Sequence, residues 1–483
     1  MFNPDKPMQR KYPAWLLILL LLIAATAAGK KPQDPEKAQS SRQVEDRFGL
    51  YNNEFLLRYV DSVGRALNAQ LPTREYNFKF RIVDQAEPNI FTFPSGHIYL
   101  SRGLLAQINT EDELAAILAH AIGHITLGHN PPKNQTAVQN QPPTLPDTAL
   151  GTAMANDLRA MMLESTGAAG PAMSAAFTPI QEADADRTGI NLASQAGYDP
   201  SALGDALNTL GKAVELMADV QPSGSFDPYP VTAHRLADIR GLAARIEWTP
   251  GRPFARDKAA LMKRLDGLRW GHQIPANGVF QGRTFVHSGL NIAITFPEGW
   301  RLENTPNYVG GFEKNARAMI VFGGAGRAAD PSVLAQTFIS RIEEEIGLSP
   351  DEAREVEIGD WPAYVVRFED ASGTEPVSLY FLWVTSPGAT YQLVGFGADE
   401  FRDQLRDAVL SLHNPGTEER AAIFNYRLRI VEARAGESLT ELKIRSENIL
   451  SDELTAIING LPMQAQLDEG ALVKVVRAEV YRR

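Results

Sequence analysis

Two histidines four residues apart are the clearest sign of chemistry in this chain. They are His120 and His124, within the segment LAHAIGH at residues 118–124. On a helix, residues at this spacing project from the same face, so both imidazoles can reach one metal ion. Zinc takes nitrogen and oxygen ligands, and a catalytic site uses three protein ligands plus water. The spacing therefore predicts a zinc site that needs one further ligand.

A pair of acids with the same spacing offers that ligand. Glu182 and Asp186 are four residues apart in a segment that we expect to be helical. We predict that Glu182 binds the metal and that Asp186 accepts a ring N–H from a ligand histidine, which fixes the tautomer of that ring. Either pair alone has a plainer explanation, because histidines meet at this spacing by chance and acids usually form a solvated face. Their joint occurrence favours the metal site.

The histidines need a helix, and the sequence predicts where it begins and ends. Thr110 can cap the helix, and Glu113 three residues later can reach back to the cap, which is the pattern of a capping box. Apolar residues then recur at helical spacing, and we expect the helix to end near Gly128.

Further elements are expected around this helix. The apolar pattern predicts an amphipathic helix over 51–71, a strand over 76–83 and a hairpin over 90–100. Residues 130–147 are rich in Pro, Gln and Asn and are predicted to form a loop or mobile lid. Helices are expected again over 149–246.

Residues 49–248 resemble a known family, the gluzincin metallopeptidases that include the CAAX prenyl protease, the heat-shock membrane protease and the β-barrel-assembly-enhancing protease. The resemblance is carried by NIFTFPSGHIY at 89–99, ELAAILAH at 113–120, EADADRTG at 182–189 and AGYDP at 196–200. It implies a mainly helical α+β peptidase domain. It also implies that zinc is bound by His120, His124 and Glu182, with Asp186 beside a ligand.

The same resemblance marks a missing group. The family places a glutamate directly after the first histidine as the general base that activates water, and this chain has Ala121 there. Positioned acid–base catalysis contributes on the order of 10² to 10⁴ in rate. We therefore expect weak or no cleavage of peptide bonds.

Two more positions belong to the predicted catalytic region. Arg235 begins a helix as it does in the family, but Tyr229 stands where a histidine is usual. Tyr229 either donates a hydrogen bond near the metal or only packs in a turn. Phe177, Thr178 and Pro179 also replace an aromatic-Ser-Arg segment. Ala121 is then either an engineered inactivation or a natural loss, and the other differences favour the natural loss.

Composition limits the partners. The chain has 483 residues, 44% of them hydrophobic and 22% charged, which is typical of two to four globular domains. A net charge of −11 argues against a nucleic-acid partner. The absence of cysteine excludes disulfides, thiolate zinc sites and a cysteine nucleophile.

The first residues have the features of a targeting segment. Basic residues precede an apolar run over 14–28 that contains small residues in an A-x-A-like pattern. The run is shorter than the roughly 20 residues of a bilayer span. We expect residues 1–29 to be a cleaved signal peptide, with an uncleaved N-terminal anchor as the alternative. In both cases the protein is expected in the periplasm or cell envelope.

The remaining chain is predicted to form two further units. Residues 30–48 are a linker and 249–275 a connector, and strand-like runs predict a separate α+β accessory domain over 276–414. This domain resembles the C-terminal region of some exported members of the family, and a binding or scaffolding role is expected. Residues 415–483 resemble a degenerate LysM module, a small α/β unit. The resemblance implies binding to peptidoglycan; the alternative is a packing domain without glycan affinity.

Three functions fit these predictions. The first is a zinc metalloendopeptidase of envelope protein quality control, acting on unassembled polypeptides and in contact with envelope or outer-membrane assembly proteins. The second is a pseudoprotease that holds polypeptide or cell-wall material. The third is a zinc-binding structural module without a substrate. Only the first predicts turnover.

Overall fold

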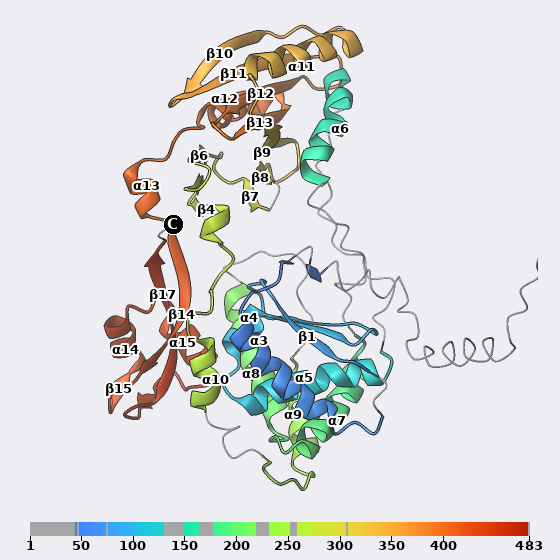
Figure 1. Ribbon diagram of the computed structural model, residues 1–483, viewed down its shortest axis with the longest axis vertical. Coiled ribbons are helices and arrows are strands. Elements are labelled where there is room, and N and C mark those ends of the chain that lie inside the picture. Colours follow the sequence, from blue (N-terminus) through green and yellow to red (C-terminus); the bar gives the residue numbers. More distant parts are fainter. Residues whose placement is uncertain are drawn as a thin grey trace, which may run out of the picture.

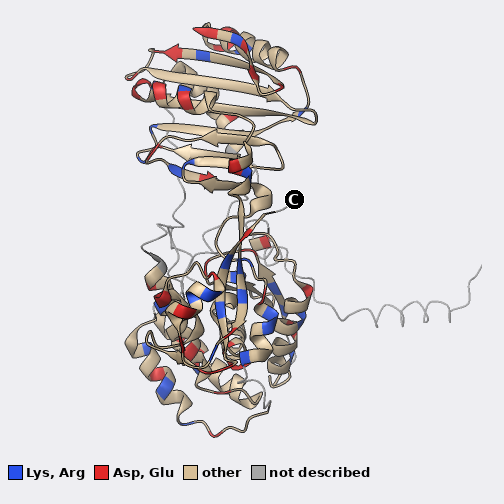
Figure 2. Cartoon of the chain, turned by 90° about the vertical axis from the view of Figure 1, so that its left-hand side faces the viewer, with Lys and Arg blue, Asp and Glu red and all other residues tan. Residues whose placement is uncertain are grey.

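The computed structural model describes residues 44–45, 48–73, 76–129, 148–163, 177–218, 231–251, 258–305 and 308–481. The predicted targeting segment, the predicted loop over 130–147 and Tyr229 lie outside these ranges. None of the helices in the described ranges combines the length and the apolar character that crossing a bilayer requires. In the side view of Figure 2, acidic and basic residues are interspersed over both lobes.

The lower lobe in Figure 1 contains helices packed against a small sheet. The sheet has the order β1-β3-β2, with β1 parallel and β2 antiparallel to β3. Its strands are β1 (Lys79–Val83), β2 (Ile90–Thr92) and β3 (His97–Ser101). The helices are α3 (Glu54–Asn68), α4 (Arg102–Gln107), α5 (Glu111–Thr126), α7 (Pro179–Gln195), α8 (Ala202–Ala218) and α9 (Ala233–Ala243). The strand, hairpin and helices predicted over 51–128 are confirmed.

The upper lobe is built on a seven-stranded antiparallel sheet of order β10-β11-β12-β13-β9-β8-β7. These strands are β7 (Arg301–Asn304), β8 (Tyr308–Phe312), β9 (Ala318–Arg327), β10 (Glu352–Ile358), β11 (Trp361–Asp370), β12 (Val377–Thr385) and β13 (Ala389–Ala398). The elements that accompany this sheet are β4 (Val279–Gln281), β5 (Thr284–His287), β6 (Ile292–Thr295), α11 (Pro331–Ile346) and α12 (Arg402–Leu410). A sheet-rich part therefore follows the helical part, as expected.

One helix lies in a different lobe from its sequence neighbours. α6 (Ala149–Leu163) falls inside the range predicted for the peptidase domain, but it packs beside α11 on the large sheet (Figure 1). Leu150, Met154 and Leu158 recur every four residues and are fully buried in the same core as Phe338. This apolar stripe fits the face of the accessory sheet, so α6 is part of that core although it is distant in sequence.

The C-terminal tail has two long strands with two helices between them in sequence. The strands β14 (Phe424–Glu432) and β17 (Leu472–Val480) are antiparallel. The other elements of this region and of the connector are α10 (Lys258–Leu265), α13 (Thr417–Ala421), β15 (Glu437–Ser438), α14 (Leu439–Ser446), α15 (Asp452–Asn459) and β16 (Gln466–Leu467). The resemblance to LysM stays a prediction.

The tail is docked on the helical part of the lower lobe (Figure 1). Leu428, Ile458 and Val476 are fully buried in the same hydrophobic core as Leu105 of α4. Lys474 is also fully buried, and its Nζ donates to the carbonyl oxygens of Ala106 and Ile108, each at 3.0 Å. The tail and the helical part therefore share one core.

Candidate metal centre

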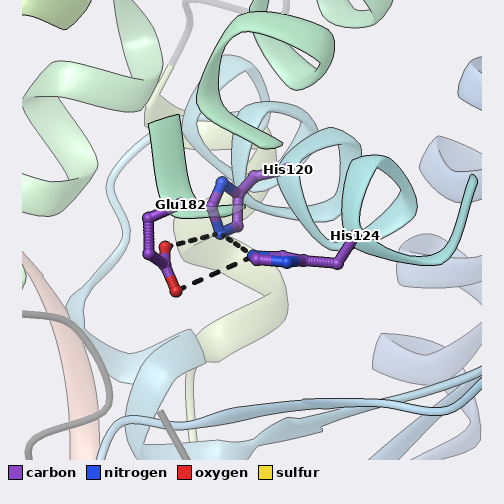
Figure 3. A group of neighbouring side chains, drawn as sticks. All are labelled: His120, His124 and Glu182. Carbon is purple, nitrogen blue, oxygen red and sulfur yellow. Dashed lines mark hydrogen bonds and ion pairs between the residues drawn. The ribbon is translucent and has the colours of Figure 1, made fainter. Parts of the chain in front are cut away.

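The two histidines of α5 and one acid of α7 meet at a buried point (Figure 3). Nε2 of His120 lies 3.1 Å from Nε2 of His124 and 3.5 Å from Oε2 of Glu182, and Nε2 of His124 lies 3.8 Å from Oε1 of Glu182. All three residues are buried. The structure thus brings together the three ligands that the sequence predicted.

The first turn of α5 fixes where this helix starts. Thr110 caps it as predicted, because its Oγ1 accepts the N–H of Glu113 at 3.1 Å. The reciprocal half of the predicted capping box differs. Oε2 of Glu113 accepts the N–H of Asn109 at 2.6 Å instead of that of Thr110. The cap therefore extends one residue further toward the N-terminus.

Small residues allow α5 and α7 to approach closely. A Cβ on Gly189 would lie 2.6 Å from the backbone nitrogen of His120, and a Cβ on Gly123 would lie 3.1 Å from the carbonyl oxygen of Ala185. Larger side chains at these positions would hold the helices apart. The close approach places Glu182 opposite the two imidazoles.

A network of charged groups surrounds the ligands. Asp186 Oδ1 lies 2.9 Å from Nδ1 of His120, which is the contact that the sequence predicted for it. Arg235 of α9 donates from Nε and Nη2 to the two oxygens of Asp186, both at 2.8 Å. The same Nη2 donates to Oε2 of Glu182 at 2.9 Å. One guanidinium therefore holds the carboxylates of both Glu182 and Asp186.

Sequence reasoning placed Arg235 at the site but missed its partners. The available signal was the pair of acids at helical spacing, Glu182 and Asp186, because a planar guanidinium with its donors fixed in a fork can bridge two carboxylates. No local pattern indicates which of the chain's arginines does so. Whether Arg235 also has a catalytic role stays a prediction.

Burial and these charges shift the pKa values at the site. Burial raises the pKa of Glu182 to about 7, although His120 and Arg235 act to lower it. Burial would also raise the pKa of Asp186, but hydrogen bonds from Arg235 and His120 outweigh it and hold this pKa well below its usual range. Burial, together with His120 and His129, lowers the pKa of His124 to about 2. His124 is therefore neutral at physiological pH, which is the form that coordinates metals.

Ala121 stands on α5 between the ligands and is buried. Two carboxylates are candidates to replace the missing base, and each is paired with another group. Glu113 lies in the first turn of α5 and accepts from Asn109. Asp184 is substantially exposed and pairs with Arg187 at 3.2 Å. Tyr229 is outside the described residues.

Two residues beside His124 were not predicted to matter. Its ring is stacked on that of Phe177, with the ring centres 3.8 Å apart and an interplanar angle of 19°. Its Nδ1 lies 3.1 Å from Nδ1 of His129. His129 thus contacts the ring nitrogen of His124 that does not point at Glu182.

The donor set fits zinc. Two imidazole nitrogens and one carboxylate are a ligand combination that zinc uses in catalytic sites. Oε1 of Glu182 is buried and has no hydrogen-bond partner among the described residues, and it faces Nε2 of His124. A bound cation would satisfy this oxygen and the imidazole lone pairs together.

Comparisons with known proteins agree with this site. Residues 55–243 match peptidase family M48. The β-barrel assembly-enhancing protease of Yersinia pestis is 28% identical over 243 residues, which are 48% of this chain and 49% of that protein. The homologous protein of Escherichia coli is 29% identical over 210 residues, 42% of each chain. Metalloprotease LoiP of Escherichia coli is 26% identical over 189 residues, 39% of this chain and 71% of that protein. The chain spans about half the length of the β-barrel assembly-enhancing proteases.

Proposed function

We propose that this chain, whose residues 55–243 belong to the zinc-dependent peptidase family M48, is a zinc-binding envelope protein that cleaves peptide bonds weakly or not at all. One observation carries the proposal. The buried donor set of His120, His124 and Glu182 is complete, but the residue beside it is Ala121. The described residues include the three groups that can hold a metal, whereas the side chain at position 121 cannot accept a proton.

The chain's own residues have separate roles in this proposal. His120, His124 and Glu182 hold the zinc, which when bound polarises a carbonyl group as a Lewis acid. Asp186 accepts the hydrogen on Nδ1 of His120 and so keeps Nε2 free to coordinate. Arg235 holds the carboxylates of Glu182 and Asp186 in place through its hydrogen bonds to both of them.

We further propose that the ligand of this site is polypeptide. The supporting observation is that relatives are named proteases, several of them for β-barrel assembly. A chain with an intact donor set and no base can bind an extended polypeptide without cleaving it. The bound polypeptides would then be unassembled envelope proteins. Residues 1–29 would direct export of the chain, which would then work in contact with outer-membrane assembly proteins. The tail would add contact with peptidoglycan.

A second candidate is an active quality-control protease inactivated by design at one position. An engineered inactivation and a natural loss predict different activities after a glutamate is restored at position 121. If only Ala121 separates the chain from an active enzyme, Ala121→Glu alone restores full activity. If Tyr229 and the segment at 177–179 have also diverged, the restored base gives only partial activity.

The test compares casein cleavage by the native chain, Ala121→Glu and Ala121→Gln, with zinc content measured for each. Glutamine matches glutamate in size but is not a base, so it controls for the added volume. We expect about one zinc per native chain and little cleavage. Ala121→Glu should be faster by up to about 10² to 10⁴, and Ala121→Gln should not be faster.

Two results would contradict the proposal. Robust cleavage by the native chain that stops on adding a chelator would show that the site works without a glutamate at position 121. A folded native sample without zinc, even after incubation with zinc salts, would refute the assignment of the three ligands.

A further inference from the structure

The end of α5 turns back over one of its own histidines. Gly128 has a positive φ of 67°, and after it the N–H of His129 donates to the carbonyl oxygen of His124 at 2.9 Å. The N–H of Gly128 donates to the carbonyl of Ile125 at 3.1 Å. These two bonds form a Schellman motif, the commonest way to end a helix with a glycine in the left-handed region. The motif places the side chain of His129 against that of His124.

The two rings meet through specific atoms. Nδ1 of His124 lies 3.1 Å from Nδ1 of His129, while Nε2 of His124 faces His120 and Glu182. A hydrogen bond between two ring nitrogens needs one hydrogen, and a neutral imidazole carries one hydrogen in total. If Nε2 of His124 keeps its lone pair for a metal, the hydrogen of that ring is on Nδ1. His124 then donates to His129, and His129 carries its own hydrogen on Nε2.

We propose that His129 is a positioning residue that fixes the tautomer and orientation of His124, and that Phe177 restricts the rotation of the same ring by stacking on it. The inference rests on the proposed zinc site. It gives each ligand histidine its own acceptor, with Asp186 serving His120 at 2.9 Å and His129 serving His124. Groups that accept the second N–H of a ligand histidine raise its basicity and hold its ring in the coordinating direction.

A simpler explanation is that the contact only closes the helix. Schellman motifs commonly bring together the side chains at these two positions, and in most of them the contact is apolar. If His129 only packs on His124, an apolar ring of similar size should replace it without effect on the metal. If it accepts the Nδ1 hydrogen, only an acceptor can replace it.

The experiment uses the full chain with His129→Phe and His129→Asn. Phenylalanine keeps a ring but cannot accept a hydrogen bond, whereas Oδ1 of asparagine can reach the place of Nδ1. Zinc affinity is measured by competition with a chromophoric chelator. We expect His129→Phe to weaken zinc binding by about 10- to 100-fold and His129→Asn to restore most of the affinity. His234→Phe is the control, because this histidine side chain is 87% exposed, and we expect no change.

A spectroscopic readout separates positioning from packing. In the zinc-loaded protein with ¹⁵N-labelled histidine, the proton of His124 should be found on Nδ1 and be protected from exchange by its hydrogen bond to His129. In His129→Phe this protection should be lost, and in His129→Asn it should be kept.

The outcomes distinguish the inference from the function on which it rests. A native chain that binds no zinc refutes the proposed site and the inference with it. Zinc binding that His129→Phe leaves within twofold of the native affinity refutes the inference alone. A His129→Phe variant that unfolds at lower temperature but binds zinc normally also overturns it, because the contact would then only close the helix.

Discussion

The two ends of α5 bury polar groups in opposite ways. The first turn holds three consecutive acids, Glu111, Asp112 and Glu113, all buried. A helix N-terminus favours negative charge, and each acid also accepts a hydrogen bond from the protein. The donors to these acids are the hydroxyls of Tyr59 and Tyr198, the N–H of Asp199 and the N–H of Asn109. Other parts of the protein therefore supply the hydrogen-bond donors to the acids of this first turn.

The metal-facing half has the reverse arrangement. His120, His124 and Glu182 direct acceptor atoms at one another (Figure 3). Asp186 and His129 contact the outer ring nitrogens of His120 and His124, and Arg235 donates to Oε2 of Glu182. Acceptors that face one another favour binding of a cation between them. The comparison teaches that α5 is anchored at one end by hydrogen bonds from the rest of the protein, whereas its other end presents acceptor atoms that a cation can bind. The two ends should therefore respond to different perturbations.

The largest effect is expected from Lys474→Met, which perturbs the anchored end. Nζ of Lys474 is fully buried against the α4–α5 turn, and its charge attracts that of Glu113. Burial raises the pKa of Glu113 and lowers that of Lys474, while each charge favours the other. Removing one partner of such a buried pair leaves a charge uncompensated, which costs about 3–5 kcal/mol. The free energy of unfolding in urea measures this loss.

The pH dependence of that loss has a defined sign. A carboxyl group whose pKa is raised on folding destabilises the folded state once it must ionise, so the part of the Lys474→Met penalty that comes from Glu113 should grow above the ordinary glutamate pKa of about 4.3 and vanish below it. The part that comes from the carbonyl groups of Ala106 and Ile108, which lose their donor, should remain at low pH. Adding Glu113→Gln should recover part of the loss at pH 7. Lys212→Met, at an exposed position of α8, should change stability by less than about 0.5 kcal/mol. A loss under about 1 kcal/mol at pH 7 for Lys474→Met would show that the pair is not charged.

A smaller effect is expected from Gly189→Ala, which perturbs the metal-facing half. The new Cβ would lie 2.6 Å from the backbone nitrogen of His120, so α7 must move away from α5. Such overpacking costs about 1–3 kcal/mol. Because Glu182 moves with α7, zinc affinity should fall as well, and chelator competition measures that fall.

Gly241→Ala is the matched control for this substitution. Gly241 is also inside a helix, α9, but a Cβ there has no heavy atom within 4 Å. Alanine restricts the unfolded chain, so stability should rise by up to about 1 kcal/mol, with zinc affinity unchanged. A Gly189→Ala variant that behaves like Gly241→Ala would contradict the close packing of α5 on α7.

The contrast between the two ends also shows what the sequence could predict. The spacing of His120 and His124 and the cap at Thr110 are local patterns, and the helix that they define was predicted nearly to the residue. Glu182 and Asp186 were found because their spacing repeats that of the histidines. These features need no knowledge of what packs against the helix.

Features that depend on distant contacts were not predictable. Lys474 is 366 residues from Ile108, and nothing around it in the sequence marks it as buried. α6 has an apolar stripe that would suit either lobe, so its position was decided by the complementary face of α11. The role of Arg235 as a bridge between two acids followed only from the packing of α9 on α7.

The smallest effects are expected from substitutions at the helix caps. They test directly whether the two ends of α5 are independent. Thr110→Ala removes the cap of α5, and Thr178→Ala removes the cap of α7, where Oγ1 accepts the N–H of Gln181 at 3.3 Å. Each should cost about 1 kcal/mol in urea unfolding. Only Thr178→Ala should also weaken zinc binding, because Glu182 lies in the turn that this cap holds, whereas the first turn of α5 keeps its other anchors. Equal losses of zinc affinity in both variants would show that the two ends of α5 are not independent.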